Sequence, residues 1–140
     1  KKLKIFGFSA MFCIFSFSIA NNLHFYPSAY KGNFELIKFA NQNNIKAIFT
    51  NYHMQFAIVF YSKETIAASS TSALAGYLGI KFDEIVKNYP SISYLLEDRQ
   101  SSAFKECLTK QKITYRQRNF DRFILYYSLS RRLLPSECPY

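Results

Sequence analysis

The stretch Glu35–Ser69, ELIKFANQNNIKAIFTNYHMQFAIVFYSKETIAAS, decides the fold. Before its Asn-rich turn, apolar side chains recur at a loose helical spacing, and Asn33 can cap this helix. Ile45–Thr50 then reads as a short strand. The apolar run of residues 51–60 fits either a strand or a helix, and we favour a helix because the strand-like Glu64–Ser69 follows directly. This alternation of helix and strand indicates an α/β domain.

The alternation continues to the end of the chain. We expect a loop with Ser and Gly, a short helix, a third strand, a fourth helix capped by Ser101 or Ser102, and a closing hairpin, over residues 70–79, 82–88, 91–96, 101–110 and 113–129. The hairpin pattern is the clearest, because the short segment Asn119-Phe120-Asp121 separates two strand-like runs. Together the elements predict a small three-layer α/β domain with a mixed sheet that ends in a β-hairpin.

The first residues have a different composition. Lys1, Lys2 and Lys4 precede the uncharged run Ile5–Ala20, IFGFSAMFCIFSFSIA. As a helix this run spans about 24 Å, a little short of a hydrocarbon core of about 30 Å, and the interfacial residues after it lengthen the span. Basic residues before the run place that end in the cytoplasm and the rest of the chain outside. We therefore expect an N-terminal transmembrane helix that anchors the chain with a single span.

Two other interpretations of this run stay open. A signal peptide has the same basic start, and Ser18-Ile19-Ala20 suits a cleavage site, although no Met precedes Lys1. The other is a buried core helix, although Phe and Ser alternate in the run without an amphipathic period. Because the chain starts at Lys1, we also expect it to be processed or to be a fragment of a longer protein.

Composition and charge set the expected domain limits and the class of partner. The 140 residues are 49% hydrophobic and 19% aromatic, which excludes a disordered or low-complexity chain. Ordinary charge density begins near residue 31. We therefore expect a membrane anchor over residues 1–30, an extracytoplasmic domain over 31–132 and a tail over 133–140. The net charge of +9 favours anionic partners such as the headgroups of membrane lipids.

Basic residues concentrate in the last quarter of the chain. Arginines alternate there with Tyr115, Tyr126 and Tyr127, at positions Arg116, Arg118, Arg122, Arg131 and Arg132. Arg and Tyr together can bind single-stranded nucleic acid, but a domain outside the cytoplasm rarely meets it, so no nucleic-acid partner is expected. A solvated surface or contact with lipid headgroups or a lipid-linked phosphate fits this basic C-terminal face better.

The residue types that carry chemistry are scattered. His24 and His53 have no Cys or carboxylate at ligand spacing, so we expect neither a metal nor another cofactor. Asp83-Glu84 and Glu97-Asp98 are adjacent carboxylates and read as solvated ends of elements rather than a catalytic pair. The serines of residues 69–72 lack the spacing of a phosphate-binding loop. The sequence therefore predicts no catalytic constellation in this chain.

The three cysteines differ in their surroundings. Cys13 lies in the apolar run, where a thiol is inert. Cys107 and Cys138 could form a disulfide outside the cytoplasm, which would join the last helix to the tail.

The order of the motifs resembles a known family. Glu35–Thr50 is followed by Asn51-Tyr52-His53 at the start of an apolar helix and then by Tyr61–Ile66 (YSKETI), and Tyr89-Pro90 and Phe123–Tyr127 (FILYY) continue the order. This order is similar to the C-terminal extracytoplasmic portion of multi-spanning glycosyltransferases that use polyprenyl-phosphate sugars, of the dolichyl-phosphate-mannose:protein mannosyltransferase type. Those proteins have a helix, a strand, a helix led by Asp-Tyr-Trp, and then Phe-x-Ser-x-Glu-x-Ile.

The resemblance implies a role and a set of contact residues. Tyr52, Ser62 and Glu64 match the family, whereas Asn51 replaces its acid and His53 its Trp. The catalytic carboxylates of the family lie in extracytoplasmic loops near the start of its membrane domain, and no such loop is found here. The resemblance therefore implies a non-catalytic C-terminal part that caps the active cavity. This part would help bind acceptor or lipid-linked sugar donor, with Asn51, Tyr52 and His53 as contacts.

A second function stays open. The chain would then be a stand-alone binding domain, membrane-anchored or secreted, that uses its basic C-terminal face. A polyprenyl-phosphate sugar or an acceptor is a partner only under the first interpretation, whereas an anchored chain meets membrane lipids under both. Whether the chain belongs to an enzyme depends on the same choice.

Overall fold

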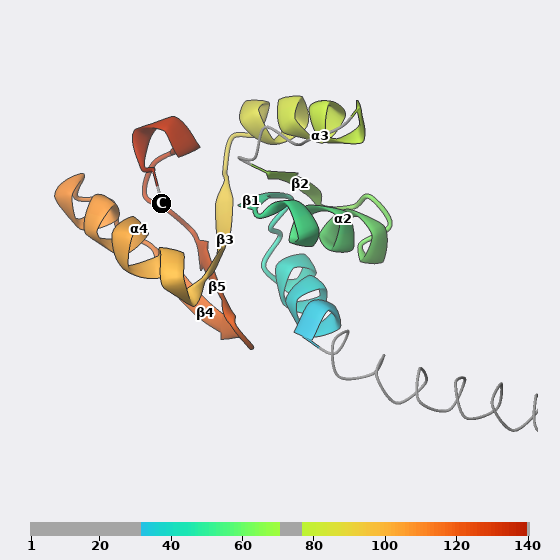
Figure 1. Ribbon diagram of the computed structural model, residues 1–140, viewed down its shortest axis with the longest axis horizontal. Helices are drawn as coiled ribbons and strands as arrows, with labels where there is room; N and C mark the ends of the chain where they lie inside the picture. The colour runs from blue at the N-terminus through green and yellow to red at the C-terminus, as the bar shows by residue number, and fades with distance from the viewer. Residues whose placement is uncertain (1–31, 71–76, 140) are drawn as a thin grey trace, which may run out of the picture. The chain divides into compact units, whose positions relative to one another are not determined.

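The computed structural model describes residues 32–70 and 77–139 (Figure 1). Residues Asn33–Tyr140 form one compact unit. A helix over residues 32–42 comes first, and the labelled elements follow in the order β1 (Ala47–Thr50), α2 (Tyr52–Tyr61), β2 (Ala67–Ser70), α3 (Tyr77–Asn88), β3 (Ser93–Glu97), α4 (Asp98–Lys110), β4 (Arg116–Phe120), β5 (Phe123–Tyr127) and η1 (Pro135–Glu137). The α/β class is confirmed, whereas the expected membrane helix over the first residues lies outside the described ranges.

The five strands form one mixed sheet in the order β2-β1-β3-β5-β4. β1 pairs in parallel with β2 on one side and β3 on the other. β5 runs antiparallel to β3, and β4 closes the sheet as the second arm of a hairpin with β5. The mixed sheet with its closing hairpin is therefore confirmed, and the parallel half carries the helical crossovers that parallel strands require.

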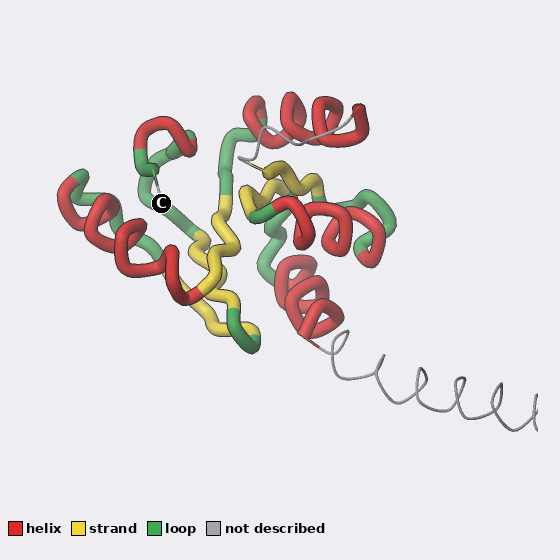
Figure 2. Tube along the Cα trace, in the orientation of Figure 1, coloured by secondary structure: helices red, strands yellow, loops and turns green. Residues whose placement is uncertain are grey.

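Alternating side chains of the strands enter two separate cores, one on each face of the sheet. On one face Phe49 of β1 packs in a cluster with Val86 of α3 and Phe104 of α4. On the other face Ile48 packs in a cluster with Ile58 of α2 and with the helix of residues 32–42. Helices thus cover both faces, and Figure 2 shows them in red around the yellow strands. The arrangement is a three-layer α/β/α domain.

Two short signals decide local structure that the apolar pattern left ambiguous. The side chain of Asn51 accepts a hydrogen bond from the backbone N–H of Met54 at 2.9 Å, so it caps α2 and makes the following run helical. In the hairpin, Asp121 adopts a positive φ of 51°, a conformation that Asp tolerates in a tight turn. The turn begins after Phe120 rather than before it. The expected loop position of Phe120 is wrong, because its ring is buried in the core and its backbone pairs with Phe123.

Two helices begin earlier than the sequence predicted. α3 begins at Tyr77, so Gly79 lies inside the helix and not in the preceding loop. One Gly costs a helix about 1 kcal/mol, which packing of the helix on the sheet outweighs. α4 begins at Asp98, directly after β3, so Ser101 is a buried residue of its second turn and not its cap. Glu97 takes the N-cap position, so the expected cap at Ser101 or Ser102 is wrong.

Residues 133–139 belong to the domain, although the sequence set them apart as a tail. Leu133 and Cys138 are fully buried in the core beneath α4. Cys138 forms a disulfide with Cys107 of α4, with their Cα atoms 5.7 Å apart. The hydroxyl of Tyr94 in β3 donates a hydrogen bond to the carbonyl oxygen of Leu133 at 2.8 Å. Covalent and packing contacts therefore hold this end of the chain on the sheet.

Candidate functional site

The adjacent parallel strands β1 and β3 form a topological switch point. After Thr50 the chain enters α2, which packs on one face of the sheet through Ile58. After Glu97 it enters α4, which packs on the opposite face through Phe104. In open α/β sheets, ligands bind outside the carboxyl ends of the strands where the chain diverges in this way. The topology therefore points to the ends of β1 and β3 as the place to look for a site.

Asn51 bridges these two strand ends. Its side-chain oxygen caps α2, and its Nδ2 donates a hydrogen bond to Oε1 of Glu97 at 3.0 Å. The other carboxylate oxygen of Glu97 lies 2.9 Å from Nε of Arg99 in an ion pair. Both side chains are half-buried, so the amide and the carboxylate keep an edge toward solvent. The pair offers a ligand one amide and one charged acceptor at the same point of the sheet.

Two buried oxygens next to this bridge in the sequence have no hydrogen-bond partner among the described residues. They are Oγ1 of Thr50, the last residue of β1, and Oε1 of Gln55 in the second turn of α2. Both residues are only 1% exposed. By strand alternation Thr50 points to the same face as Ile48, the face that α2 covers. Leaving such an oxygen unpaired costs about 1–3 kcal/mol. Thr50 and Gln55 therefore each contribute a buried oxygen that can still form a hydrogen bond.

Tyr52 and His53 form an aromatic rim at the start of α2. The Tyr52 ring packs edge-on against His53, with centroids 5.7 Å apart, and against Phe56 at 4.9 Å. Tyr52 is half-buried and His53 is exposed. The structure thus brings the three predicted contact residues to one strand end, because they are the cap and first turn of the helix that follows β1.

The end of β2 carries a different polar contact. The hydroxyl of Ser69 pairs with Oδ1 of Asp83 in α3, and the second oxygen of this carboxylate pairs with Lys87. Asp83 therefore links α3 to the sheet. From the sequence alone, Asp83 was interpreted as a solvated position at the end of an element. Within residues 32–70 and 77–139, no group of three or more His, Cys, Asp or Glu side chains is placed to hold a metal ion.

Most arginines of the predicted basic face have partners within the domain. The guanidinium groups of Arg118 and Arg122 lie 4.4 and 5.2 Å from the ring centroids of Phe39 and Phe123. Nε of Arg132 donates to a backbone carbonyl oxygen at 3.1 Å. Such contacts hold the side chains against aromatic and backbone groups of their own fold. Arg118, Arg122 and Arg132 therefore contact groups of their own domain on different elements, whereas Arg116 of β4 is exposed.

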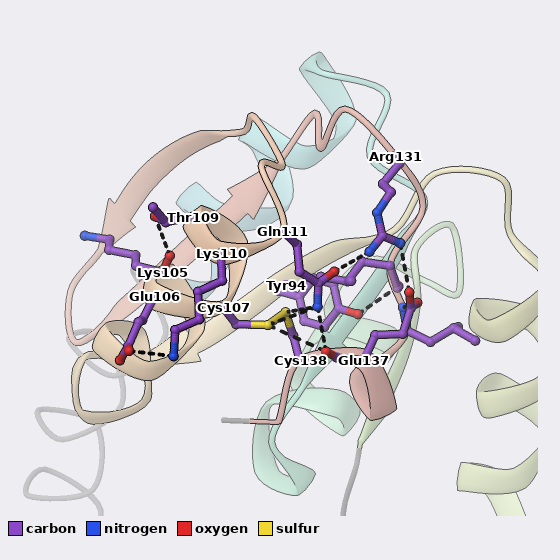
Figure 3. Close-up of a disulfide and its surroundings, with 12 residues drawn as sticks. Tyr94, Lys105, Glu106, Cys107, Thr109, Lys110, Gln111, Arg131, Glu137 and Cys138 are labelled. Carbon is purple, nitrogen blue, oxygen red and sulfur yellow. Dashed lines mark hydrogen bonds and ion pairs between the residues drawn. A yellow bond between two sulfur atoms is a disulfide. The ribbon is translucent and has the colours of Figure 1, made fainter.

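Arg131 belongs to a network around the disulfide (Figure 3). Its guanidinium donates to Oε1 of Glu137 at 2.8 Å and also pairs with the side-chain oxygen of Gln111. The amide of Gln111 in turn donates to the backbone oxygen of Glu137 at 2.8 Å. The hydrogen bond from Arg131, followed by one from the backbone N–H of Leu134, lowers the pKa of the Glu137 carboxyl. This network fastens the last residues and leaves no unpaired charge in it for a ligand.

The sequence identified only half of the candidate site. Residues 51–53 were predicted from the resemblance, whereas Glu97, Thr50 and Gln55 were missed. A signal for Glu97 existed, because a carboxylate that ends a parallel strand is a common site residue. Thr50 and Gln55 look like ordinary polar residues at the ends of a strand and a helix, and only their burial sets them apart.

Comparisons of the chain with protein-family models, curated proteins and solved structures find no match. In the part of the chain that the structure describes, no helix has both the length and the apolar character needed to cross a bilayer. The features of the chain that bear on function are therefore the resemblance of its motifs and the geometry at the ends of β1 and β3.

Proposed function

We propose that this chain is the non-catalytic C-terminal part of a membrane glycosyltransferase-like protein. In this proposal the ends of β1 and β3 help bind the acceptor or a polyprenyl-phosphate sugar, and residues outside this chain transfer the sugar. The observation that carries the proposal is the hydrogen bond from Asn51 to Glu97 across the switch point. It supports a binding role for the same residues that the resemblance indicates.

The chemistry of these residues suits a sugar. A sugar presents hydroxyl groups that both donate and accept hydrogen bonds. Glu97 supplies a charged acceptor and Asn51 an amide donor, while Tyr52 and His53 supply ring surfaces beside them. Small-molecule sites commonly combine such aromatic surface with a few convergent polar groups. A ligand hydroxyl that reached Thr50 would also satisfy an oxygen that lacks a partner among the described side chains.

The disulfide supports a location outside the cytoplasm. Disulfides persist in oxidising compartments and are rare where thiols are kept reduced. Cys107 and Cys138 are bonded and packed in the core, so the pair is part of the folded domain. Together with the apolar run Ile5–Ala20, this bond favours a domain held at the outer face of a membrane.

The test is a calorimetric titration of the full chain with a polyprenyl-phosphate mannose that carries a shortened prenyl chain. The double variant Tyr52→Ala, His53→Ala should weaken binding about tenfold, equivalent to about 1.4 kcal/mol. Thr50→Val keeps the shape of the side chain and removes the hydroxyl. It should weaken binding while leaving thermal stability unchanged or slightly raised, because a buried oxygen without a partner is lost.

The matched control is the double variant Arg116→Ala, Arg122→Ala, which alters exposed residues of the hairpin. It should bind the probe like the unaltered chain. Loss of binding in this control, with the Tyr52 and His53 variant unaffected, would support the stand-alone domain that binds through its basic face. A chain that binds neither this probe nor a Ser/Thr-containing acceptor peptide would contradict the proposal.

A further inference from the structure

Helix α2 carries an exposed aromatic surface, of which the proposed binding role uses only Tyr52. The helix contains no Asp, Glu, Lys or Arg along its ten residues. Tyr52, Phe56 and Phe60 follow one another at intervals of four and so share one side of the helix. Phe56 is 37% exposed and Phe60 is 76% exposed, although both are large apolar side chains.

The neighbouring helix extends this surface. Phe34, in the first turn of the helix of residues 32–42, is 58% exposed, and its ring centroid lies 5.3 Å from that of Tyr61. The ring of Phe60 also lies 5.3 Å from Tyr61. We call the set of Phe34, Tyr52, Phe56, Phe60 and Tyr61 the aromatic face. It joins two elements of the same outer layer, which lie next to each other in Figure 1.

The opposite layer shows what a water-facing helix of this domain looks like. α3 exposes Ile85 at 41%, but Lys81, Glu84 and Lys87 are exposed around it. α2 has no such charged residues within its length, and charges begin only beyond its end at Lys63 and Glu64. Large apolar patches rimmed by polar residues mark interaction surfaces on soluble domains. The aromatic face therefore calls for a partner that is itself apolar.

The sequence before this helix indicates which partner is present. The uncharged run Ile5–Ala20 ends twelve residues before Gly32, the first residue of the helix that carries Phe34. If this run is held in a bilayer, the start of that helix is tethered to the lipid surface by a short segment. Phe and Tyr suit the boundary between acyl chains and headgroups, because their rings are apolar and the Tyr hydroxyl can stay hydrated.

We propose that the aromatic face lies on the lipid bilayer, with Phe60 and Phe56 inserted at the boundary of headgroups and acyl chains. This inference rests on the membrane attachment in the proposed function but not on sugar binding. It assigns the contact with lipid to the uncharged outer side of α2, rather than to the arginine-rich hairpin. The ends of β1 and β3 would then lie close to the membrane, because Tyr52 belongs to both the site and the face.

The absence of Trp from the entire sequence makes a clean test available. The full chain with Phe60→Trp carries a single indole in the aromatic face, and Phe56→Trp is a second probe of the same face. Ile85→Trp is the matched control, because Ile85 is a comparably exposed apolar residue of the opposite layer. Each chain is reconstituted in phosphatidylcholine vesicles, with and without bromine on the acyl chains, and vesicle flotation first reports attachment.

The expected result is an emission maximum shifted to shorter wavelength for Phe60→Trp and Phe56→Trp, with loss of intensity on brominated lipid. Ile85→Trp should keep the emission of a hydrated indole and show no loss. Four outcomes would overturn the proposal. They are no flotation, no shift in either probe, a shift without bromine quenching (which would mean that protein covers the face), and equal quenching of the control. Failure of flotation refutes both the membrane attachment and the lipid contact of the aromatic face, whereas sugar binding is judged by the separate titration.

Discussion

Removal of the disulfide should lower the stability of the domain by a calculable amount without changing its fold. Cys107 and Cys138 are separated by 31 residues in the sequence. In the chain-entropy model, releasing a loop of this length favours the unfolded state by about 3.7 kcal/mol at 25 °C. For a domain of about 110 residues, with an unfolding entropy of about 2.1 cal/mol/K per residue, this corresponds to a fall in Tm of about 16 °C.

The fold should persist because other contacts hold the same segment. Leu133 remains buried in the core and still accepts the hydrogen bond from the hydroxyl of Tyr94. Arg131 and Gln111 still contact Glu137. The disulfide therefore acts on the freedom of the unfolded chain more than on the shape of the folded one.

The assay is thermal unfolding of the full chain, followed by circular dichroism. The double variant Cys107→Ala, Cys138→Ala should melt about 16 °C below the unaltered chain, by the loop-entropy estimate. Added reductant should bring the unaltered chain to the same midpoint and leave the variant unchanged. Cys13→Ala, which removes the third cysteine, is the control and should keep full sensitivity to reductant. A midpoint shift of only a few degrees, or equal response of the variant to reductant, would refute the reasoning.

Two further changes test the site and the core. Asn51→Ala removes both the cap of α2 and the hydrogen bond to Glu97, and should lower the free energy of unfolding by about 2 kcal/mol. Urea unfolding would measure this free energy, and Asn41→Ala, at an exposed residue near the end of the helix of residues 32–42, should change it little. Tyr126 is fully buried against Ser101, and burial raises the pKa of its phenol in the folded state. The unfolded phenol therefore ionises first, so stability is present below the usual Tyr pKa of about 10 and is lost as pH rises past it. As the pH rises above about 10, Tyr126→Phe should lose less stability than the unaltered chain, and an identical loss in both would contradict this assignment.

The elements of the parallel half were predictable because their signals are local. The strand near residues 45–50 follows from apolar spacing, and the helix after it from the strand-like segment Glu64–Ser69 that comes next in the chain, so both signals act within a few residues. The start of α4 was not predictable in the same way. Its N-cap is Glu97, whose position at the end of a buried strand is decided by pairing of β3 with β1 and β5. Such pairing joins residues that are far apart in the sequence, so a local sequence pattern cannot predict it.

The candidate site shows the same division. The resemblance of the motifs pointed to residues 51–53, and these lie together because they are consecutive. Glu97 lies 46 residues further along the chain, and only the sheet order brings its carboxylate to Asn51. The basic residues near the C-terminus give the opposite case. They look like one face in the sequence, but Arg118 lies over Phe39 while Arg131 faces Glu137, because strand and loop geometry separates their side chains.

By itself the sequence determined the alternation of helix and strand, the closing hairpin and the uncharged character of α2, since these depend on residue spacing and composition. Tertiary structure decided which face of α2 is buried and which aromatic rings are left exposed. It also decided that Oγ1 of Thr50 and Oε1 of Gln55 are buried without a hydrogen-bond partner in the described ranges. The physical reason is that burial and hydrogen-bond partnership depend on the elements that pack together, and packing is set by contacts between distant parts of the chain.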